Sequence, residues 1–299
     1  MASSRWSIIG ASVFAVALAV AHAVPGASTP PGSIVFSAHP DGAGPAQLFR
    51  VQTTGEGLAQ ITTGRLSATA PAFSPDGKRI VFVRQGSGIF RMNLDGTGLR
   101  RLTSNVRDTY PVWSPDGKRI AFLRPYRAQW RVYVMSASGG GQHLLPQAPP
   151  AGRPSWTADN RGIFIPSGGD LVRIDSRSGK VLKYYGLTLD VVTAQTATVS
   201  PNSRRIAYVG PRISTGPEDC GEGPCPQFGL YLASVTRPHR PRRIVNDTGP
   251  AGWSPGGTTL VFVSRGALTL WAVGSGTRTA IATGPHVATG DAPPAWQPR

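Results

Sequence analysis

The side chains that could carry out chemistry in this chain are few and do not cluster. After residue 23 the sequence has four histidines, and none stands at the spacing of H-E-x-x-H or another metal-ligand motif. No G-x-S-x-G nucleophile elbow is present either. We interpret each histidine as a solvated surface residue: His39, His143, His239 and His286. The sequence therefore predicts a protein without catalytic residues, a metal site or a cofactor.

Two further patterns have a structural interpretation. Asp76 and Asp116 occur in repeated S-P-D-G strings, and one carboxylate per turn falls far short of the six to eight oxygens that calcium prefers. Cys220 and Cys225 are the only cysteines, and four residues separate them. In an oxidising compartment this favours a disulfide, with free thiols as the alternative. The long segment around them is either a contact element or a plain surface insertion.

The elements that would position any site follow from internal repeats. PAFSPDGKRIVF (71–82) and PVWSPDGKRIAF (111–122) are nearly identical, and weaker copies begin at residues 154, 197 and 251. Their central apolar residues are spaced 40, 43, 43, 54 and 43 positions apart: Phe73, Trp113, Trp156, Val199, Trp253 and Trp296. Such periods with only β-type segments are typical of four-stranded propeller blades. Within each unit, S-P-D-G favours a tight hairpin.

The two ends of the chain together supply one repeat. The first unit begins at 33–36 (SIVF) without an innermost strand, whereas the string PAWQP at 294–298 stands where the chain ends. Pairing of these segments would close the ring and leave few exposed strand edges. We predict an all-β fold, a six-bladed β-propeller of four-stranded antiparallel blades over 32–299, whose first blade is closed by the C-terminal strand.

These repeats resemble the WD-like propeller repeat of the TolB family, and the resemblance covers essentially all of 32–299. It implies a six-bladed secreted or periplasmic propeller that binds a protein of the cell envelope. TolB proper also carries an α/β domain before its propeller. Only about nine residues lie here between Ala23 and the first predicted strand. We therefore expect a free-standing TolB-like propeller rather than a member of the Tol system.

The first 23 residues resemble a secretory signal peptide. Arg5 precedes an apolar stretch from Ile8 to Ala21, and small residues stand at the predicted cleavage site after Ala23. The apolar stretch is too short for a membrane span, so the cleaved chain is not expected to cross one. Residues 24–31 would form a linker. Secretion makes nucleic acid an unexpected partner, although the net charge is +16 and the pI about 11.1.

The predicted blades separate the charges onto two faces. In an antiparallel blade the first and third turns emerge on one face, here called the turn face. The second loop and the interblade connection emerge on the other, the connection face. The turn face collects most cations and is predicted to meet an anionic envelope polymer; we single out Arg100, Arg101, Arg240, Arg242 and Arg243. On the connection face the candidate ligand residues at the channel mouth are Arg107, Asp108, Arg153, Asp247 and Asp291.

The resulting functional hypothesis is a non-catalytic, monomeric scaffold that binds an envelope protein or peptide. The alternative is a carbohydrate-active enzyme that uses the propeller channel, such as a polysaccharide lyase or hydrolase. Some lyases hold a metal through histidines in such a channel. No repeat here places a histidine on its first strand.

Overall fold

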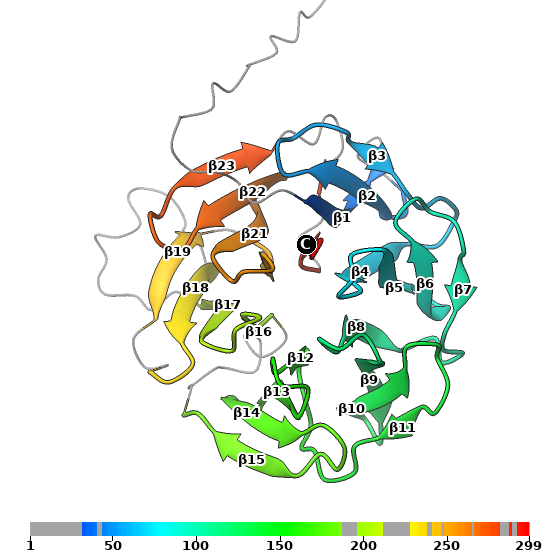
Figure 1. The fold of residues 1–299 in the computed structure, drawn as a ribbon, viewed down its shortest axis with the longest axis vertical. Coiled ribbons are helices and arrows are strands. Elements are labelled where there is room, and N and C mark those ends of the chain that lie inside the picture. Colours follow the sequence, from blue (N-terminus) through cyan, green and yellow to red (C-terminus); the bar gives the residue numbers. More distant parts are fainter. Residues whose placement is uncertain are drawn as a thin grey trace, which may run out of the picture.

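The computed structural model describes residues 32–40, 44–186, 196–211, 228–237, 241–246, 248–264, 266–281, 287–288 and 292–298. Within these ranges the chain forms six antiparallel sheets arranged as blades of a ring (Figure 1). The predicted six-bladed β-propeller is therefore confirmed. The predicted signal peptide and linker lie outside the described residues.

Each of the first three blades is built around a long central hairpin. Blade 1 contains β1 (Ser33–His39), β2 (Gln47–Gln52), β3 (Ala59–Gln60), β24 (Val287–Ala288) and β25 (Ala295–Trp296). Blade 2 contains β4 (Ala68–Phe73), β5 (Arg79–Arg84), β6 (Gly88–Asn93) and β7 (Arg100–Arg101). Blade 3 contains β8 (Thr109–Trp113), β9 (Arg119–Tyr126), β10 (Gln129–Ser136) and β11 (His143–Leu144).

The last three blades follow the same order, from a short innermost strand to an outer one. Blade 4 contains β12 (Ser155–Trp156), β13 (Gly162–Ser167), β14 (Asp170–Asp175) and β15 (Val181–Tyr184). Blade 5 contains β16 (Thr198–Val199), β17 (Arg205–Pro211), β18 (Phe228–Ser234) and β19 (Arg242–Asn246). Blade 6 contains β20 (Gly252–Trp253), β21 (Thr259–Ser264), β22 (Ala267–Ala272) and β23 (Arg278–Ile281).

The repeated S-P-D-G string forms the first turn of a blade through its own side chains. In blade 2, Ser74 Oγ lies 2.5 Å from Asp76 Oδ1 and accepts a hydrogen bond from Arg79 N at 3.0 Å. Asp76 Oδ1 also accepts from Lys78 N at 3.1 Å. The same arrangement recurs in blades 3, 4 and 5, at Ser114–Asp116, Thr157–Asp159 and Ser200–Asn202. The turn interpretation of these aspartates is thus confirmed.

The core lies between the blades rather than within one. Alternate residues of a strand point to opposite sides of its sheet. On β21, Leu260 and Phe262 pack toward blade 5, whereas Val261 and Val263 pack toward blade 1. Six such clusters fill the spaces between neighbouring blades. A blade is therefore stabilised by both of its neighbours.

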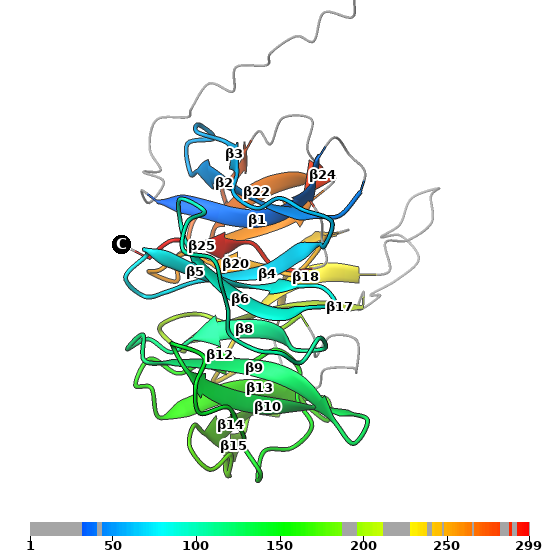
Figure 2. The same ribbon diagram turned by 90° about the vertical axis from the view of Figure 1, so that its right-hand side faces the viewer.

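The C-terminal strand closes the ring as predicted. β25 pairs antiparallel with β1, with Trp296 opposite Ile34 and Ala295 opposite Val35. Gln297 N donates to Ser33 O at 2.8 Å, and Gln297 Nε2 donates to the carbonyl of Gly77 in blade 2 at 3.0 Å. In the side view β25 lies between β1 and β20 (Figure 2). The last residues of the fold thus join blades 1, 2 and 6.

Candidate ligand pocket on the connection face

A pocket of about 430 Å³ opens between blades 3 and 4 on the connection face. Its walls come from the start of β8, the β9–β10 loop, the connection that leads into β12, and the β13–β14 turn. They are formed mainly by apolar side chains and by residues with small side chains: Thr109, Tyr110, Leu123, Ala128, Gln129, Trp130, Pro150, Ala151, Gly152, Arg153, Pro166, Ser167, Gly168 and Gly169. Such a lining, with few polar groups, is typical of ligand pockets.

Two residues of the pocket wall have a left-handed backbone conformation. Tyr110, directly before Pro111, has φ of 49°, and the pairing of β8 with β9 shifts register between Thr109 and Val112. In the β9–β10 loop Ala128 has φ of 62°. Positive φ is costly for residues other than glycine, so packing must hold these two positions. Both residues line the pocket.

Arg153 is the one cation among the described residues of the pocket wall. Its Nη1 atom is buried, and no hydrogen bond or ion pair joins its guanidinium to another residue that the structure describes. Burial lowers the pKa of Arg153 to about 10, and the neighbouring Tyr110 opposes this shift. At neutral pH the group therefore stays charged while lacking much of its hydration.

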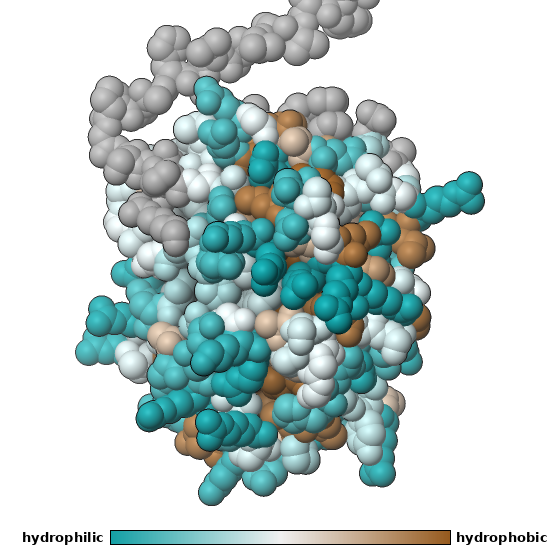
Figure 3. All heavy atoms as spheres, turned by 45° about the vertical axis from the view of Figure 1, so that its right-hand side comes forward, coloured by the Kyte–Doolittle hydropathy of each residue, from teal (hydrophilic) through white to brown (hydrophobic). Residues whose placement is uncertain are grey.

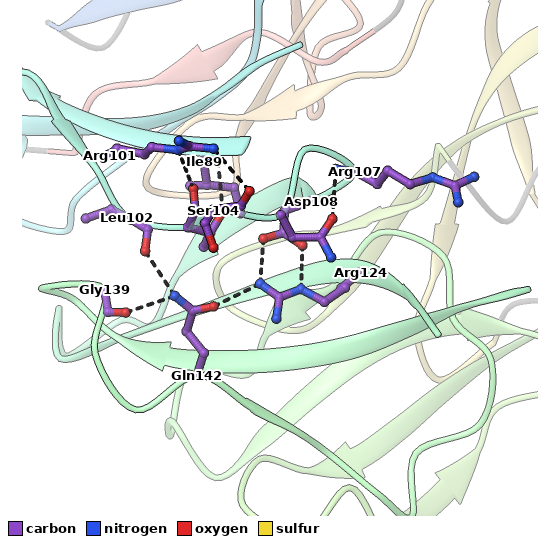
Figure 4. Close-up of polar contacts among 11 residues, drawn as sticks. Ile89, Arg101, Leu102, Ser104, Arg107, Asp108, Arg124, Gly139 and Gln142 are labelled. Carbon is purple, nitrogen blue, oxygen red and sulfur yellow. Dashed lines mark hydrogen bonds and ion pairs between the residues drawn. The ribbon is translucent and has the colours of Figure 1, made fainter. Parts of the chain in front are cut away.

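Asp108, the residue before the pocket, is committed to an ion pair. Arg124 donates to both of its carboxylate oxygens, from Nε to Oδ1 at 2.6 Å and from Nη2 to Oδ2 at 2.7 Å (Figure 4). The Asp108 side chain is fully buried. Gln142 extends the network, accepting from Arg124 Nη2 at 2.8 Å and donating to Leu102 O at 3.0 Å. The hydrogen bond to Asp108 raises the pKa of Arg124.

The other predicted channel-mouth residues do not join Asp108 in one cluster. Arg107 is exposed, and its side chain points away from the Asp108 carboxylate (Figure 4). Asp247 and Asp291 lie outside the described residues, as do Cys220 and Cys225 in the segment between β17 and β18.

The predicted basic residues lie on the outer rim of the ring. Arg100 and Arg101 form β7, the outermost strand of blade 2, while Arg242 and Arg243 begin β19, the outermost strand of blade 5. These blades stand on opposite sides of the ring, so the two pairs are not brought together (Figure 1). Arg240 lies outside the described residues.

Some of these rim cations interact with other groups of the protein. Arg101 donates to the carbonyls of Thr103 and Ser104 at 2.9 and 3.1 Å, and Arg242 stacks over the Trp271 ring at 4.9 Å. Arg243 lines a hollow of about 660 Å³ between blades 5 and 6. The side of the molecule that bears blades 2 and 3 is covered mostly by hydrophilic side chains, with small hydrophobic patches (Figure 3).

A second hollow, on the turn face between blades 3 and 4, gathers charges of both signs. Asp159 and Asp175 lie in it beside Arg119, Arg161 and Arg177. The hydrogen bond from Thr157 lowers the pKa of Asp159, and the backbone hydrogen bond from Ser178 lowers that of Asp175. These carboxylates serve their own turns. Across the described ranges no group of three or more His, Cys, Asp or Glu side chains could hold a metal ion.

The sequence profile of the TolB beta propeller domain matches residues 22–174, which is more than half of the chain. The chain belongs to this family. Among curated proteins none matches the sequence. In the part of the chain that the structure describes, no helix is long and apolar enough to cross a membrane.

Solved structures with the same architecture include TolB proteins and a lyase. TolB from Acinetobacter baumannii superposes with a TM-score of 0.71 at 20% identity, over 90% of this chain and 67% of that one. Putative TolB from Agrobacterium tumefaciens superposes with a TM-score of 0.60 at 16% sequence identity, over 88% of this chain and 92% of that one. An oligogalacturonate lyase in complex with manganese superposes with a TM-score of 0.54 at 14% sequence identity, over 84% of this chain and 74% of that one. At these identities the likeness shows the fold alone.

Sequence reasoning identified Arg153 but missed the aromatic walls of its pocket in this TolB-family propeller. Trp130 follows a loop and is 37% exposed, and Tyr110 occupies a left-handed backbone position that the sequence does not reveal. An available signal was the string YRAQW at 126–130, in which two aromatic residues flank a predicted second loop. Large aromatic residues beside loops on a rigid scaffold are frequent in recognition sites.

Proposed function

We propose that this protein is a secreted or periplasmic, non-catalytic TolB-like propeller that binds a protein or peptide ligand and acts as a scaffold in the cell envelope. The pocket between blades 3 and 4 is the observation that carries the proposal. In the part of the chain that the structure describes, it combines an exposed aromatic residue, Trp130, with mainly apolar walls and one cation, Arg153. Aromatic and arginine anchors in a desolvated centre dominate the energetics of most protein interfaces.

The location of the pocket makes it accessible to a protein or peptide chain. Its walls come from two loops, one strand start and one interblade connection, all on one face of the ring. Rigid blades hold these segments, so a partner can be recognised without refolding the propeller. The signal-peptide pattern of the first 23 residues and the family membership support an extracytoplasmic location.

Site-specific photocrosslinking in cells tests the scaffold proposal. A photoreactive residue in place of the exposed Gln129 reports on the connection face, and one in place of the exposed Lys118 reports on the turn face. We expect position 129 to yield a discrete crosslinked envelope protein, and position 118 to yield none of the same mass. Adducts of equal yield at both positions, or none at position 129, would contradict the proposal.

The alternative is a carbohydrate-active enzyme, and the shared fold of the oligogalacturonate lyase is the observation that favours it. A lyase would generate unsaturated products from polygalacturonate or another acidic polysaccharide when divalent metal is supplied. We expect the purified mature chain to release none above a no-protein control. Metal-dependent release that persists after repurification would replace the scaffold proposal with this one.

A further inference from the structure

We propose that the pocket between blades 3 and 4 binds a carboxylate of its peptide ligand, an acidic side chain flanked by apolar residues, through Arg153. This inference rests on the proposed function and specifies the chemistry of its ligand. It places the recognition of negative charge in one pocket of the connection face, not on the arginine-rich rim.

The charge of Arg153 has no partner among the residues that the structure describes. A guanidinium that is partly removed from water is costly unless it is paired and hydrogen-bonded. Arg153 has a buried Nη1 atom and forms no ion pair with a described residue. A carboxylate entering the pocket would supply both the opposite charge and the hydrogen-bond acceptors, and arginine matches carboxylate geometry well.

The two acidic residues adjacent in sequence to the pocket wall form hydrogen bonds with groups other than Arg153. Asp108 precedes the wall residue Thr109, and both of its oxygens accept from Arg124. Asp170 follows the wall residue Gly169, and its oxygens accept from Leu171 N at 2.7 Å and Gly186 N at 3.0 Å. No hydrogen bond or ion pair joins either of these two carboxylates to Arg153 among the described residues.

The apolar lining of the pocket determines which groups of the ligand can surround the carboxylate. Leu123, Trp130, Pro150 and Pro166 supply apolar surface around the cation, while the polar side chains in the wall are few. A sugar chain would need hydrogen-bonding partners for several hydroxyl groups. Apolar side chains on either side of a carboxylate bury their surface here without leaving polar groups unpaired. The lining therefore favours an acidic peptide over an acidic polysaccharide.

The experiment titrates the isotopically labelled full-length mature chain with defined probes and follows its backbone amides by NMR. The probes are N-acetylated, C-amidated pentapeptides with a central glutamate flanked by leucine, phenylalanine or proline, and the same peptides with glutamine. Galacturonate oligomers form a third arm. We expect the best glutamate peptide to shift Gly152, Gly168 and Gly169, and to bind at least about tenfold more tightly than its glutamine counterpart.

Two variants test whether the peptide carboxylate pairs specifically with Arg153 or is attracted by the overall positive charge of the protein. Arg153→Gln should weaken binding of the glutamate peptide by at least about tenfold and leave the affinity for the glutamine peptide unchanged. Arg107→Gln removes the same charge from an exposed neighbour on the same face, and is expected to change affinity less than about twofold at physiological salt. Equal losses in both variants would overturn the proposal.

Unfolding of the ligand-free variants distinguishes an internal partner from an external one. If Arg153 awaits a ligand, Arg153→Gln should leave the urea midpoint unchanged or raise it, because it removes an unpaired charge. Arg107→Gln is the control, and a loss of stability confined to Arg153→Gln would assign the partner of Arg153 to this chain and overturn the proposal.

The remaining outcomes separate this inference from the function on which it rests. Glutamate and glutamine peptides that shift the pocket residues equally would refute the carboxylate and leave the scaffold proposal standing. Binding of galacturonate oligomers alone would overturn the peptide assignment. Absence of any binding to the pocket would refute the inference, and photocrosslinking at Gln129 would then decide whether the scaffold proposal also fails.

Discussion

At the residue scale, the Asp108–Arg124 pair is a buried, doubly hydrogen-bonded ion pair on the connection face. It joins the connection before β8 to β9 within blade 3, and Gln142 ties it to Leu102 of the preceding blade. We expect Asp108→Asn to destabilise the fold by about 3 kcal/mol, the low end for breaking a buried pair, because Arg124 is partly exposed. Urea unfolding measures this. Arg107→Ala, at an exposed position, should change stability by less than about 0.5 kcal/mol; a similar loss in both variants would contradict the assignment.

The S-P-D-G aspartates give stability a defined pH dependence. The hydrogen bond from Ser74 lowers the pKa of Asp76 below its usual value of 3.8. A carboxyl group whose pKa is lower in the folded state stabilises the fold above its unfolded pKa. That stabilisation disappears as the pH falls through the folded pKa.

Asp76→Asn should therefore reduce the loss of stability between about pH 5 and pH 2, by less than about 1 kcal/mol because the group is largely exposed. Blade 5 shows that the turn accepts the substitution, since Asn202 already accepts from Arg204 N at 3.1 Å. Urea midpoints at several pH values provide the measurement. A pH dependence identical to that of the parent chain would refute the role of Asp76.

Among the elements, the C-terminal segment is the one on which ring closure depends. A Cβ atom at Gly252 of β20 would lie 2.0 Å from the carbonyl oxygen of Pro294, so only glycine lets the segment approach blade 6. We expect Gly252→Ala to destabilise the fold by about 2 kcal/mol or more in thermal or urea unfolding. Gly256→Ala is the matched control, because its nearest neighbour would be Thr258 Oγ1 at 3.8 Å. Equal stability of the two variants would contradict this packing.

β25 provides a second test of closure at the same scale. Trp296 is 5% exposed and packs in the cluster between blades 1 and 6. Trp296→Ala should cost about 3 kcal/mol, as large aromatic truncations in a core do. Hydrogen exchange should then rise in β1, its pairing partner, and in β20, but not in β14 on the far side of the ring. Uniform exchange across all blades would mean that closure is not local to this strand.

For the whole molecule, the net charge of +16 predicts salt-sensitive adsorption to anionic polymers. Because Arg100 and Arg101 lie on one side of the rim and Arg242 and Arg243 on the other, neither pair alone defines an adhesive face. We expect charge reversal of either pair to reduce retention on an anionic matrix by a similar amount. High salt should abolish the difference in retention between each variant and the parent chain. Retention that depends on one pair only, or that ignores salt, would contradict this distributed attraction.

How far the sequence determined the fold depends on which contacts repeat. Asp76 and Asp116 lie in strings with a single favourable turn geometry, and the spacing of the six central apolar residues of the repeats indicates six units, so the ring and its closure were predictable. Arg124 gave no such signal, because its pairing with Asp108 joins residues 16 positions apart that share no motif. The rim positions of Arg100 and Arg242 depend on which strand lies outermost. The sequence assigned each cation to the turn face or the connection face from the turn nearest to it. That procedure could not distinguish a residue on the outer rim from one on the turn face.

The central claim is that the connection face, at the pocket of Arg153, holds the ligand. A crystal structure of residues 24–299 with the tightest glutamate peptide tests this most directly. We expect a peptide carboxylate within about 3.2 Å of the Arg153 guanidinium and an apolar neighbouring side chain of the peptide against Trp130. A peptide bound on the turn face, or Arg153 paired with a carboxylate of its own chain, would contradict it.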